Sequence, residues 1–198
     1  MSALDWAKDT ASHGDPAKAW RELKNGVVSR LVAVEAKLPP KRGVVHSPFE
    51  PRAKFRVTSP VDAKRAHNLN NEPEVAEWLL ENTKQGDVVW DVGAHHGHFS
   101  VVLALANRQV VSFEPNVDNY QRLSENLFLN GLLGTVTTVP LALGEERGKS
   151  DMEGDHDGAL RLTGEGDDVA VIRGDQAEQP APDAIKLDVE GHELEALI

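Results

Sequence analysis

Short apolar runs alternate with amphipathic stretches from residue 73 onward, and this order constrains the fold more than any other feature of the sequence. The apolar runs are Val88–Val92, Gln109–Phe113, Val136–Leu143 and Ala184–Val189, and the expected helices are Glu74–Asn82, Phe99–Asn107, Val117–Asn130 and one that starts near Glu193. Runs this short are typical of buried parallel strands, whose crossovers must pass over a face of the sheet. The sequence therefore predicts an α/β fold with a doubly wound parallel sheet, helices on both faces and ligand binding beyond the carboxyl ends of the strands.

One internal segment, residues 144–182, interrupts this alternation. It is rich in Gly, Asp, Glu and Pro, which favour turns and loops. Within it we expect only a short hairpin, formed by Ala159–Leu162 and Val169–Ile172.

The sequence before residue 72 has a different character. An amphipathic helix is expected to begin at Pro16 and to end before Pro39. A basic, loop-rich connection then runs from Lys41 to Arg65, and it either receives an anionic substrate or forms a solvated surface. We therefore expect an N-terminal extension over residues 1–71 and one ligand-binding domain over residues 72–198.

The composition excludes several classes of site and partner. With no cysteine, the chain has no disulfide, no thiolate nucleophile and no cysteine-ligated metal. The net charge of −11 arises from residues 151–198, which hold 14 acidic and 3 basic side chains, and such a segment repels nucleic acids. No apolar run approaches the roughly 18–20 residues that cross a bilayer, and the first residues do not resemble a signal peptide. We therefore expect a cytoplasmic protein that binds neither nucleic acid nor membrane.

The segment Asp91–Gly97 joins an expected strand to an expected helix and carries the pattern D-x-G-x-x-x-G. A dinucleotide-binding turn would carry G-x-G-x-x-G and leave the helix N-terminus open to a pyrophosphate. A carboxylate at Asp91 repels a pyrophosphate but suits an ammonium group, and Gly93 lets a ligand lie against the backbone. S-adenosylmethionine carries such an ammonium group and a sulfonium. The turn residues expected to bind it are Asp91, Gly93, Ala94, His95 and Gly97.

An acidic residue at the end of the next expected strand completes this pattern. Glu114 follows Gly93 by 21 residues, a spacing at which its carboxylate can accept hydrogen bonds from both ribose hydroxyls of a nucleoside. Pro115, which follows it, is also expected to bind the cofactor, and Ala142, at the end of the third strand, is expected beside the adenine. Each feature also has an ordinary structural interpretation, because Asp91 could cap a helix and Glu114 could be a strand-end charge. Their joint placement favours a nucleoside cofactor.

The second cluster, Ile185–Glu193, also passes from a strand into a helix. Asp188, Glu190 and His192 are candidates for the base that removes a proton from a methyl acceptor. Together they could equally hold a divalent cation that polarises an acceptor diol, or simply stabilise a helix N-terminus.

Three histidines, His95, His96 and His98, invite comparison with a metal site. Adjacent histidines at a turn diverge in direction, however, and no carboxylate follows them at ligand spacing. We therefore expect no metal here and favour a role in lining the cofactor pocket.

Four segments occur in a fixed order: GDVVWDVGAHHGHFS, VVSFEPNVDNYQRLSENLFLN, VTTVPLALG and DAIKLDVEGHELEAL. From about Glu72 to Ile198 the chain resembles the FkbM-type S-adenosylmethionine-dependent methyltransferases, which mostly methylate hydroxyls of sugars, polyketides and other small molecules. The resemblance implies a Rossmann-like fold of the class I methyltransferase type. It also implies that Asp91, Gly93 and Gly97 form the first cofactor motif, that Glu114 binds the ribose, and that residues 188–191 are the family signature.

The family fold has seven strands, whereas this sequence stops at Ile198, within the helix after the fourth. We therefore expect a C-terminally incomplete sheet, with an exposed edge covered by a second copy of the chain or by a partner. The main hypothesis is an O-methyltransferase acting on a small molecule or saccharide. The alternatives are a catalytically inactive or truncated cofactor-binding or assembly module, and an NAD-dependent oxidoreductase, which the missing second glycine disfavours.

Overall fold

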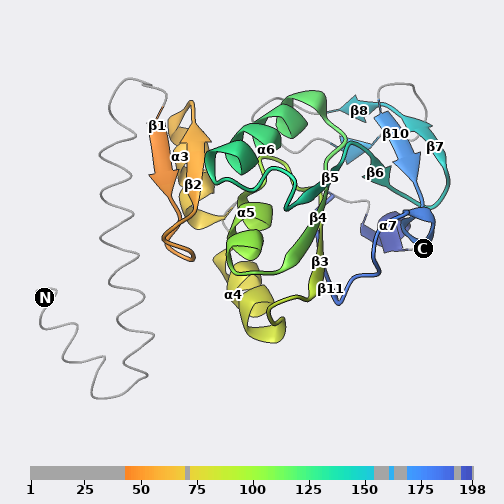
Figure 1. The fold of residues 1–198 in the computed structure, drawn as a ribbon. Coiled ribbons are helices and arrows are strands. Elements are labelled where there is room, and N and C mark those ends of the chain that lie inside the picture. The colour runs from red at the N-terminus through yellow and green to blue at the C-terminus, as the bar shows by residue number, and fades with distance from the viewer. Residues whose placement is uncertain (1–42, 70–71, 154–160, 163–168, 190–192, 198) are drawn as a thin grey trace, which may run out of the picture.

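The computed structural model describes residues 43–69, 72–153, 161–162, 169–189 and 193–197. Its centre is a four-stranded parallel sheet (Figure 1), ordered β11 (Ala184–Leu187), β3 (Val88–Val92), β4 (Gln109–Phe113) and β5 (Thr137–Val139). In chain order these are the fourth, first, second and third strands of the sheet, which is the order of a doubly wound fold. The predicted parallel α/β sheet is thus confirmed.

Three helices cover one face of this sheet (Figure 1). They are α4 (Pro73–Asn82), α5 (His98–Leu105) and α6 (Val117–Leu129), close to the ranges expected from the sequence. Their buried residues form one apolar cluster with Val89 and Val110 of the sheet, and α5 is the most deeply buried of the three. Because α5 is apolar almost all round, it is enclosed rather than amphipathic.

The opposite face is covered mainly by short strands. Trp90, Val92 and Phe113 pack there against Leu143 and against Ala196 of α7 (Glu193–Leu197). In the described residues, helices therefore lie on both faces of the sheet, with α4, α5 and α6 on one face and only α7 on the other.

The segment after β5 differs from the sequence prediction. The expected strand 136–143 ends in the sheet at Val139, because Pro140 has no amide hydrogen to continue the ladder. The chain then enters a second sheet of three strands, ordered β6 (Ala142–Leu143), β10 (Val169–Ile172) and β7 (Gly148–Ser150). A separate pair joins β8 (Met152–Glu153) to β9 (Arg161–Leu162), and η1 (Gly174–Gln176) follows β10.

The expected hairpin in this segment is therefore wrong. The strand β10 pairs with β6 and β7, and β9 pairs with β8. The apolar residues identified the strands but not their partners, since β6 and β7 are distant from β10 in sequence, and β9 is about as near to β8 before it as to β10 after it.

The basic segment before α4 is folded rather than loop-rich. It contains an antiparallel pair, β1 (Gly43–His46) and β2 (Lys54–Val57), followed by α3 (Pro60–Asn68). In β2 the buried Phe55 and Val57 alternate with Lys54 and Arg56, which is the period of a strand with one face inward. The expected helix between Pro16 and Pro39 lies outside the described residues.

This N-terminal unit shares the apolar cluster of the main domain. Asn126 of α6 and Asn130, which caps that helix, bond the backbone of β2: Asn126 Oδ1 accepts from the Arg56 amide and Asn130 Oδ1 from the Lys54 amide, both at 2.9 Å. The unit is thereby fixed over α6, near the turn that follows β3.

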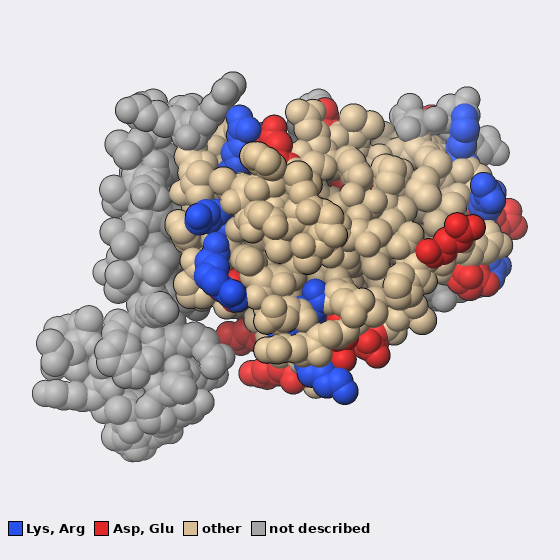
Figure 2. All heavy atoms as spheres, viewed as in Figure 1, with Lys and Arg blue, Asp and Glu red and all other residues tan. Residues whose placement is uncertain are grey.

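Charge is distributed unevenly over the surface. Figure 2 shows lysine and arginine side chains gathered on the side of the molecule where β1 and β2 lie. None of the described helices has the length and apolar character that crossing a membrane requires.

Candidate functional site

The groups singled out in the sequence meet at the carboxyl edge of the central sheet. The amides of Gly93 and Ala94, just after β3, donate to the carbonyl oxygen of Phe113 at 3.0 and 2.9 Å. On the other side, the Asp188 amide donates to the carbonyl oxygen of Val92 at 3.1 Å. The turn after β3, Glu114 after β4 and Asp188 after β11 therefore form one continuous site, as parallel strand ends require.

Gly93 is required by two features of the turn after β3. Its φ is +74°, a left-handed conformation, and a Cβ built on it would lie 1.9 Å from the carbonyl oxygen of Asp188. No side chain fits between the backbones of β3 and β11 at this point. At the other end of the turn, Gly97 has a φ of +76° and lies against Leu123 of α6.

Glu114 is a buried carboxylate with its oxygens held in place. Its Oε2 accepts from the His95 amide at 2.7 Å and its Oε1 from the Asn116 amide at 2.9 Å. Burial raises the pKa of Glu114, and these hydrogen bonds partly oppose that rise. Oε1 also accepts from Asn119 Nδ2 at 3.4 Å. Each carboxylate oxygen can accept two hydrogen bonds, so Oε2 retains capacity toward a hydroxyl of a diol, and Oε1 gains it when the long bond from Asn119 is released.

Asp91 is completely buried beneath the turn, at 0% exposure. The Ser100 hydroxyl of α5 donates to its Oδ2 at 2.5 Å, and the hydroxyl of Ser112 of β4 lies 2.8 Å from that of Ser100. This carboxylate thus ties β3 to α5 and β4.

Lys186 is the main site residue that the sequence interpretation missed. Its ammonium group lies 3.4 Å from Asp91 Oδ1 and 3.4 Å from Asp188 Oδ2, and it donates to the carbonyl oxygen of Gly93 at 3.0 Å. It also lies 5.3 Å from the ring centroid of Phe99. A signal was present, because a lysine inside a buried apolar strand needs a partner, and the register of β11 on β3 pairs it with Asp91.

The remaining predicted site residues differ in how deeply they are buried. Ala94 is buried in the turn, Pro115 is half-buried after Glu114, and Ala142 is buried in β6. The Asp188 side chain is 30% exposed, in contrast to Asp91. Glu190 and His192 lie outside the described residues.

The histidines of the turn form a stacked cluster. The rings of His95 and His96 are 3.8 Å apart and nearly parallel, and His96 Nδ1 lies 3.2 Å from Asp62 Oδ1 of α3. Burial lowers the pKa of His95 to about 3, and that of His98 lies well below its ordinary value for the same reason. Among the described residues, no three potential ligands gather closely enough to hold a metal ion.

The basic segment before α4 is partly neutralised by the chain itself. Arg52 pairs with Glu50 at 2.8 Å and Arg56 with Glu125 at 3.4 Å. These arginines therefore favour the solvated-surface interpretation over an anion site.

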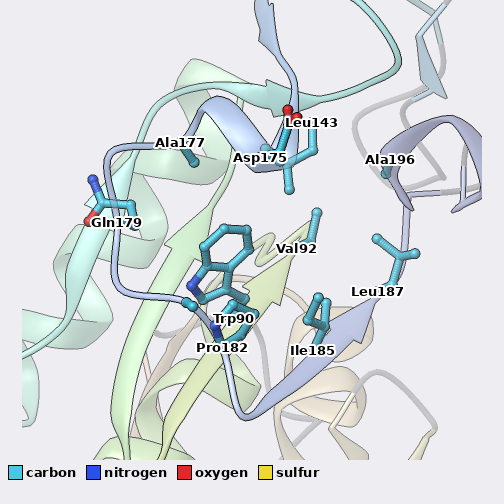
Figure 3. A pocket seen from close by; sticks show the side chains of 12 residues that line it. Trp90, Val92, Leu143, Asp175, Ala177, Gln179, Pro182, Ile185, Leu187 and Ala196 are labelled. Carbon is cyan, nitrogen blue, oxygen red and sulfur yellow. The ribbon is translucent and has the colours of Figure 1, made fainter. Parts of the chain in front are cut away.

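An apolar pocket lies on the opposite face of the sheet (Figure 3). Trp90 and Val92 of β3 and Ile185 and Leu187 of β11 line it. These residues alternate along their strands with Asp91 and Lys186, so the sheet separates the pocket from the carboxylate cluster. The pocket is a feature distinct from the candidate site.

Comparison with known proteins gives concordant matches. The family described as "Methyltransferase FkbM domain" matches residues 91–198. The hexuronic acid methyltransferase AglP of Haloferax volcanii is 33% identical over 185 residues, which are 86% of this chain and 76% of that protein.

Solved structures were also found to be similar. The methyltransferase FkbM from Methylobacillus flagellatus shares 21% identity, with 70% of this chain and 38% of that one covered and a TM-score of 0.40. The C-terminal domain of precorrin-6Y C5,15-methyltransferase from Rhodobacter capsulatus shares 27% identity, with 35% and 39% covered and a TM-score of 0.33. The chain thus spans less than half the length of each of these two solved proteins.

Proposed function

Because the chain belongs to the FkbM methyltransferase family, we propose that it transfers the methyl group of S-adenosylmethionine to an oxygen atom of a saccharide or another small molecule. The observation that carries the proposal is the meeting of Gly93, Glu114 and Asp188 at one sheet edge. A turn that begins with a glycine and is flanked by carboxylates suits a ligand with a ribose, an ammonium group and a sulfonium. When bound, this cofactor supplies a methyl group attached to positively charged sulfur.

Glu114 is the proposed ribose ligand. Its two backbone hydrogen bonds hold the carboxylate in one orientation, so little conformational entropy is lost when hydroxyls bind. The free-energy cost of burying this carboxylate arises when the protein folds, before any ligand binds. Because little water reaches the site, hydrogen bonds from the ribose hydroxyls would displace few well-bound water molecules.

Asp188 is the better placed of two carboxylates to receive the α-ammonium group. The sequence assigns this role to Asp91, but Asp91 has no exposed surface and already faces the ammonium of Lys186. Asp188 is partly exposed at the rim and is held by the same lysine. We therefore assign ammonium binding to Asp188, and to Asp91 the role of fixing Lys186 and the N-terminal part of α5.

The balance of charge at this edge favours a cationic ligand. Three carboxylates, Asp91, Glu114 and Asp188, surround one ammonium group, that of Lys186. S-adenosylmethionine has one more positive charge than its demethylated product, S-adenosylhomocysteine. Binding of the reactant is therefore electrostatically favoured over binding of the product.

For the acceptor we propose a saccharide that contains a uronic acid, because the curated relative is named as a hexuronic acid methyltransferase. Such a sugar offers hydroxyl groups and a carboxylate as methyl acceptors. The two products differ chemically, since a methyl ester is hydrolysed by mild alkali and a methyl ether is not.

A methyl-transfer assay tests this function. The full chain is incubated with methyl-labelled S-adenosylmethionine and either glucuronic acid-containing or neutral oligosaccharides, and alkali treatment then separates ester from ether. We expect label on the acidic saccharide and at least tenfold less with Glu114→Gln. Binding of S-adenosylhomocysteine without transfer to any acceptor would instead support the cofactor-binding module, and no binding would contradict both.

A further inference from the structure

We propose that His96, oriented by Asp62, is the base that accepts the proton of the acceptor hydroxyl during methyl transfer. This inference rests on the proposed function. It adds to the proposed active site His96, from the turn after β3, and Asp62, from α3. It differs from the sequence-based candidates, Asp188, Glu190 and His192, which all follow β11.

The Asp62 carboxylate is fixed from both sides. Thr58 donates to its Oδ2 through the hydroxyl at 2.8 Å and the amide at 3.1 Å, which leaves Oδ1 for His96 Nδ1 at 3.2 Å. Its own amide donates to Ser59 Oγ, the N-cap of α3. Burial raises the pKa of Asp62, but the hydrogen bonds from His96 and Thr58 outweigh it and hold that pKa well below its usual range. Asp62 is therefore an anion whose position is set before any ligand binds.

The His96 ring is held at the edge of the proposed cofactor site. The Asn126 side chain of α6 donates to the carbonyl oxygen of His96 at 2.8 Å, and the ring stacks on His95. The amide of His95 in turn bonds Glu114, the proposed ribose ligand. The His96 side chain retains 16% exposure, whereas His98 is almost completely buried. His96 is thus more accessible to a substrate than His98, and it differs from the half-buried His95 in being paired with Asp62.

The hydrogen bond to Asp62 decides which nitrogen can act. With Nδ1–H donated to the carboxylate, the lone pair of the neutral ring lies on Nε2. As the acceptor oxygen forms its bond to the methyl carbon, the C–S bond breaks with its electron pair left on sulfur, and the hydroxyl proton passes to Nε2. The resulting imidazolium is then paired with Asp62, as in other histidine–carboxylate pairs.

The charged groups near this histidine pair come from α3 and β11. Asp62 of α3 faces His96 Nδ1, while Arg65 of α3 and Lys186 of β11 are the positive charges that act on the neighbouring ring of His95. Burial lowers the pKa of His95 in the turn to about 3 and also lowers the pKa of His98 at the start of α5, so both rings are neutral at neutral pH. The α6 residue that bonds His96, Asn126, is uncharged.

The test compares His96→Gln and Asp62→Asn with the control His46→Gln. His46 is an exposed histidine of the N-terminal unit that also contains Asp62. We expect kcat to fall by about 10²–10⁴-fold in His96→Gln, the range typical of losing a general base, and less in Asp62→Asn. Calorimetric affinity for S-adenosylhomocysteine should stay within about twofold in all three, because none of these side chains is a proposed cofactor ligand.

A second readout does not depend on activity. Long-range ¹⁵N NMR should show His96 with its proton on Nδ1 in the wild type, and a mixture of tautomers in Asp62→Asn. A wild-type kcat in His96→Gln would overturn the proposal, as would parallel losses of kcat, cofactor affinity and Tm, which indicate a structural role. A wild-type chain that transfers no methyl group would contradict the proposed function itself.

Discussion

Two glycines with the same backbone conformation have very different surroundings. Gly93 has a φ of +74° and Gly131 a φ of +70°, but only Gly93 has another backbone, that of Asp188, within reach of an added Cβ. We predict that Gly131→Ala costs about 1–2 kcal/mol, the penalty of a left-handed conformation. Gly93→Ala should cost roughly 1–3 kcal/mol more, because β3 and β11 must separate. Urea denaturation of both variants measures the difference, and equal losses would contradict the close approach.

The buried ammonium of Lys186 gives a second residue-level prediction. In Lys186→Met the carboxylate of Asp91 stays buried without its counter-charge, and breaking such a pair typically costs about 3–5 kcal/mol. The double variant Asp91→Asn/Lys186→Met should recover part of this loss, as measured in a double-mutant cycle.

Lys84→Met, at an exposed lysine, serves as the control and should change stability by less than about 0.5 kcal/mol. If Lys186→Met is no more destabilising than this control, Lys186 does not compensate Asp91.

At the residue scale, the sequence predicted the groups tied to strand ends. Asp91, Gly93, Glu114 and Asp188 could be placed because short apolar runs fix where each strand ends. Whether they bind a cofactor stays a prediction. Lys186 and Asp62 were missed, since their partners depend on strand register and on the docking of α3.

At the scale of elements, one side chain of α6 links two separate parts of the fold. Asn126 is fully buried, accepts from the Arg56 amide of β2 and donates to the carbonyl oxygen of His96. We predict that Asn126→Ala destabilises the protein by about 2–3 kcal/mol, because a partly buried amide and a partly buried carbonyl lose their partners. Thermal or urea unfolding measures this, with the exposed Asn82→Ala as control. Similar stability of the two variants would show that β2 docks through its apolar side chains alone.

The helices and parallel strands of the main domain were predictable because each forms from a continuous stretch of regular periodicity. The pairing of β6, β7 and β10 was not, since it joins segments separated by an irregular connection. The hairpin of β1 and β2 was missed for another reason: its basic residues suggested a loop, although Phe55 and Val57 already carried the alternation of a strand.

At the scale of the whole molecule, buried neutral histidines should make stability depend on pH. Burial lowers the pKa values of His67, His95 and His98, so below about pH 6.5 the unfolded chain binds more protons than the folded one. Stability is therefore greatest above pH 6.5 and falls as the pH decreases, by up to about 1.4 kcal/mol per unit for each histidine. The raised pKa of Glu114 has the opposite effect on stability, because it favours the folded state as the pH falls. Glu114 is one group, however, and the histidines are three.

Urea unfolding between pH 7.5 and 4.5 measures this slope. His95→Asn removes one titrating ring and keeps a residue that tolerates a φ of +50°, so its slope should be shallower. A stability that rises toward pH 4.5 would contradict the burial of these histidines.

The most direct test of the account is calorimetric titration of S-adenosylhomocysteine into the wild type, Glu114→Gln and the exposed control Glu81→Gln. We predict that the wild type and the control bind equally. Glu114→Gln should bind more weakly by about 1–3 kcal/mol, or roughly 5–150-fold, through loss of charge-assisted hydrogen bonds to the ribose. Equal affinity of all three proteins, or no binding by the wild type, would contradict the assignment of the cofactor site to this edge of the sheet.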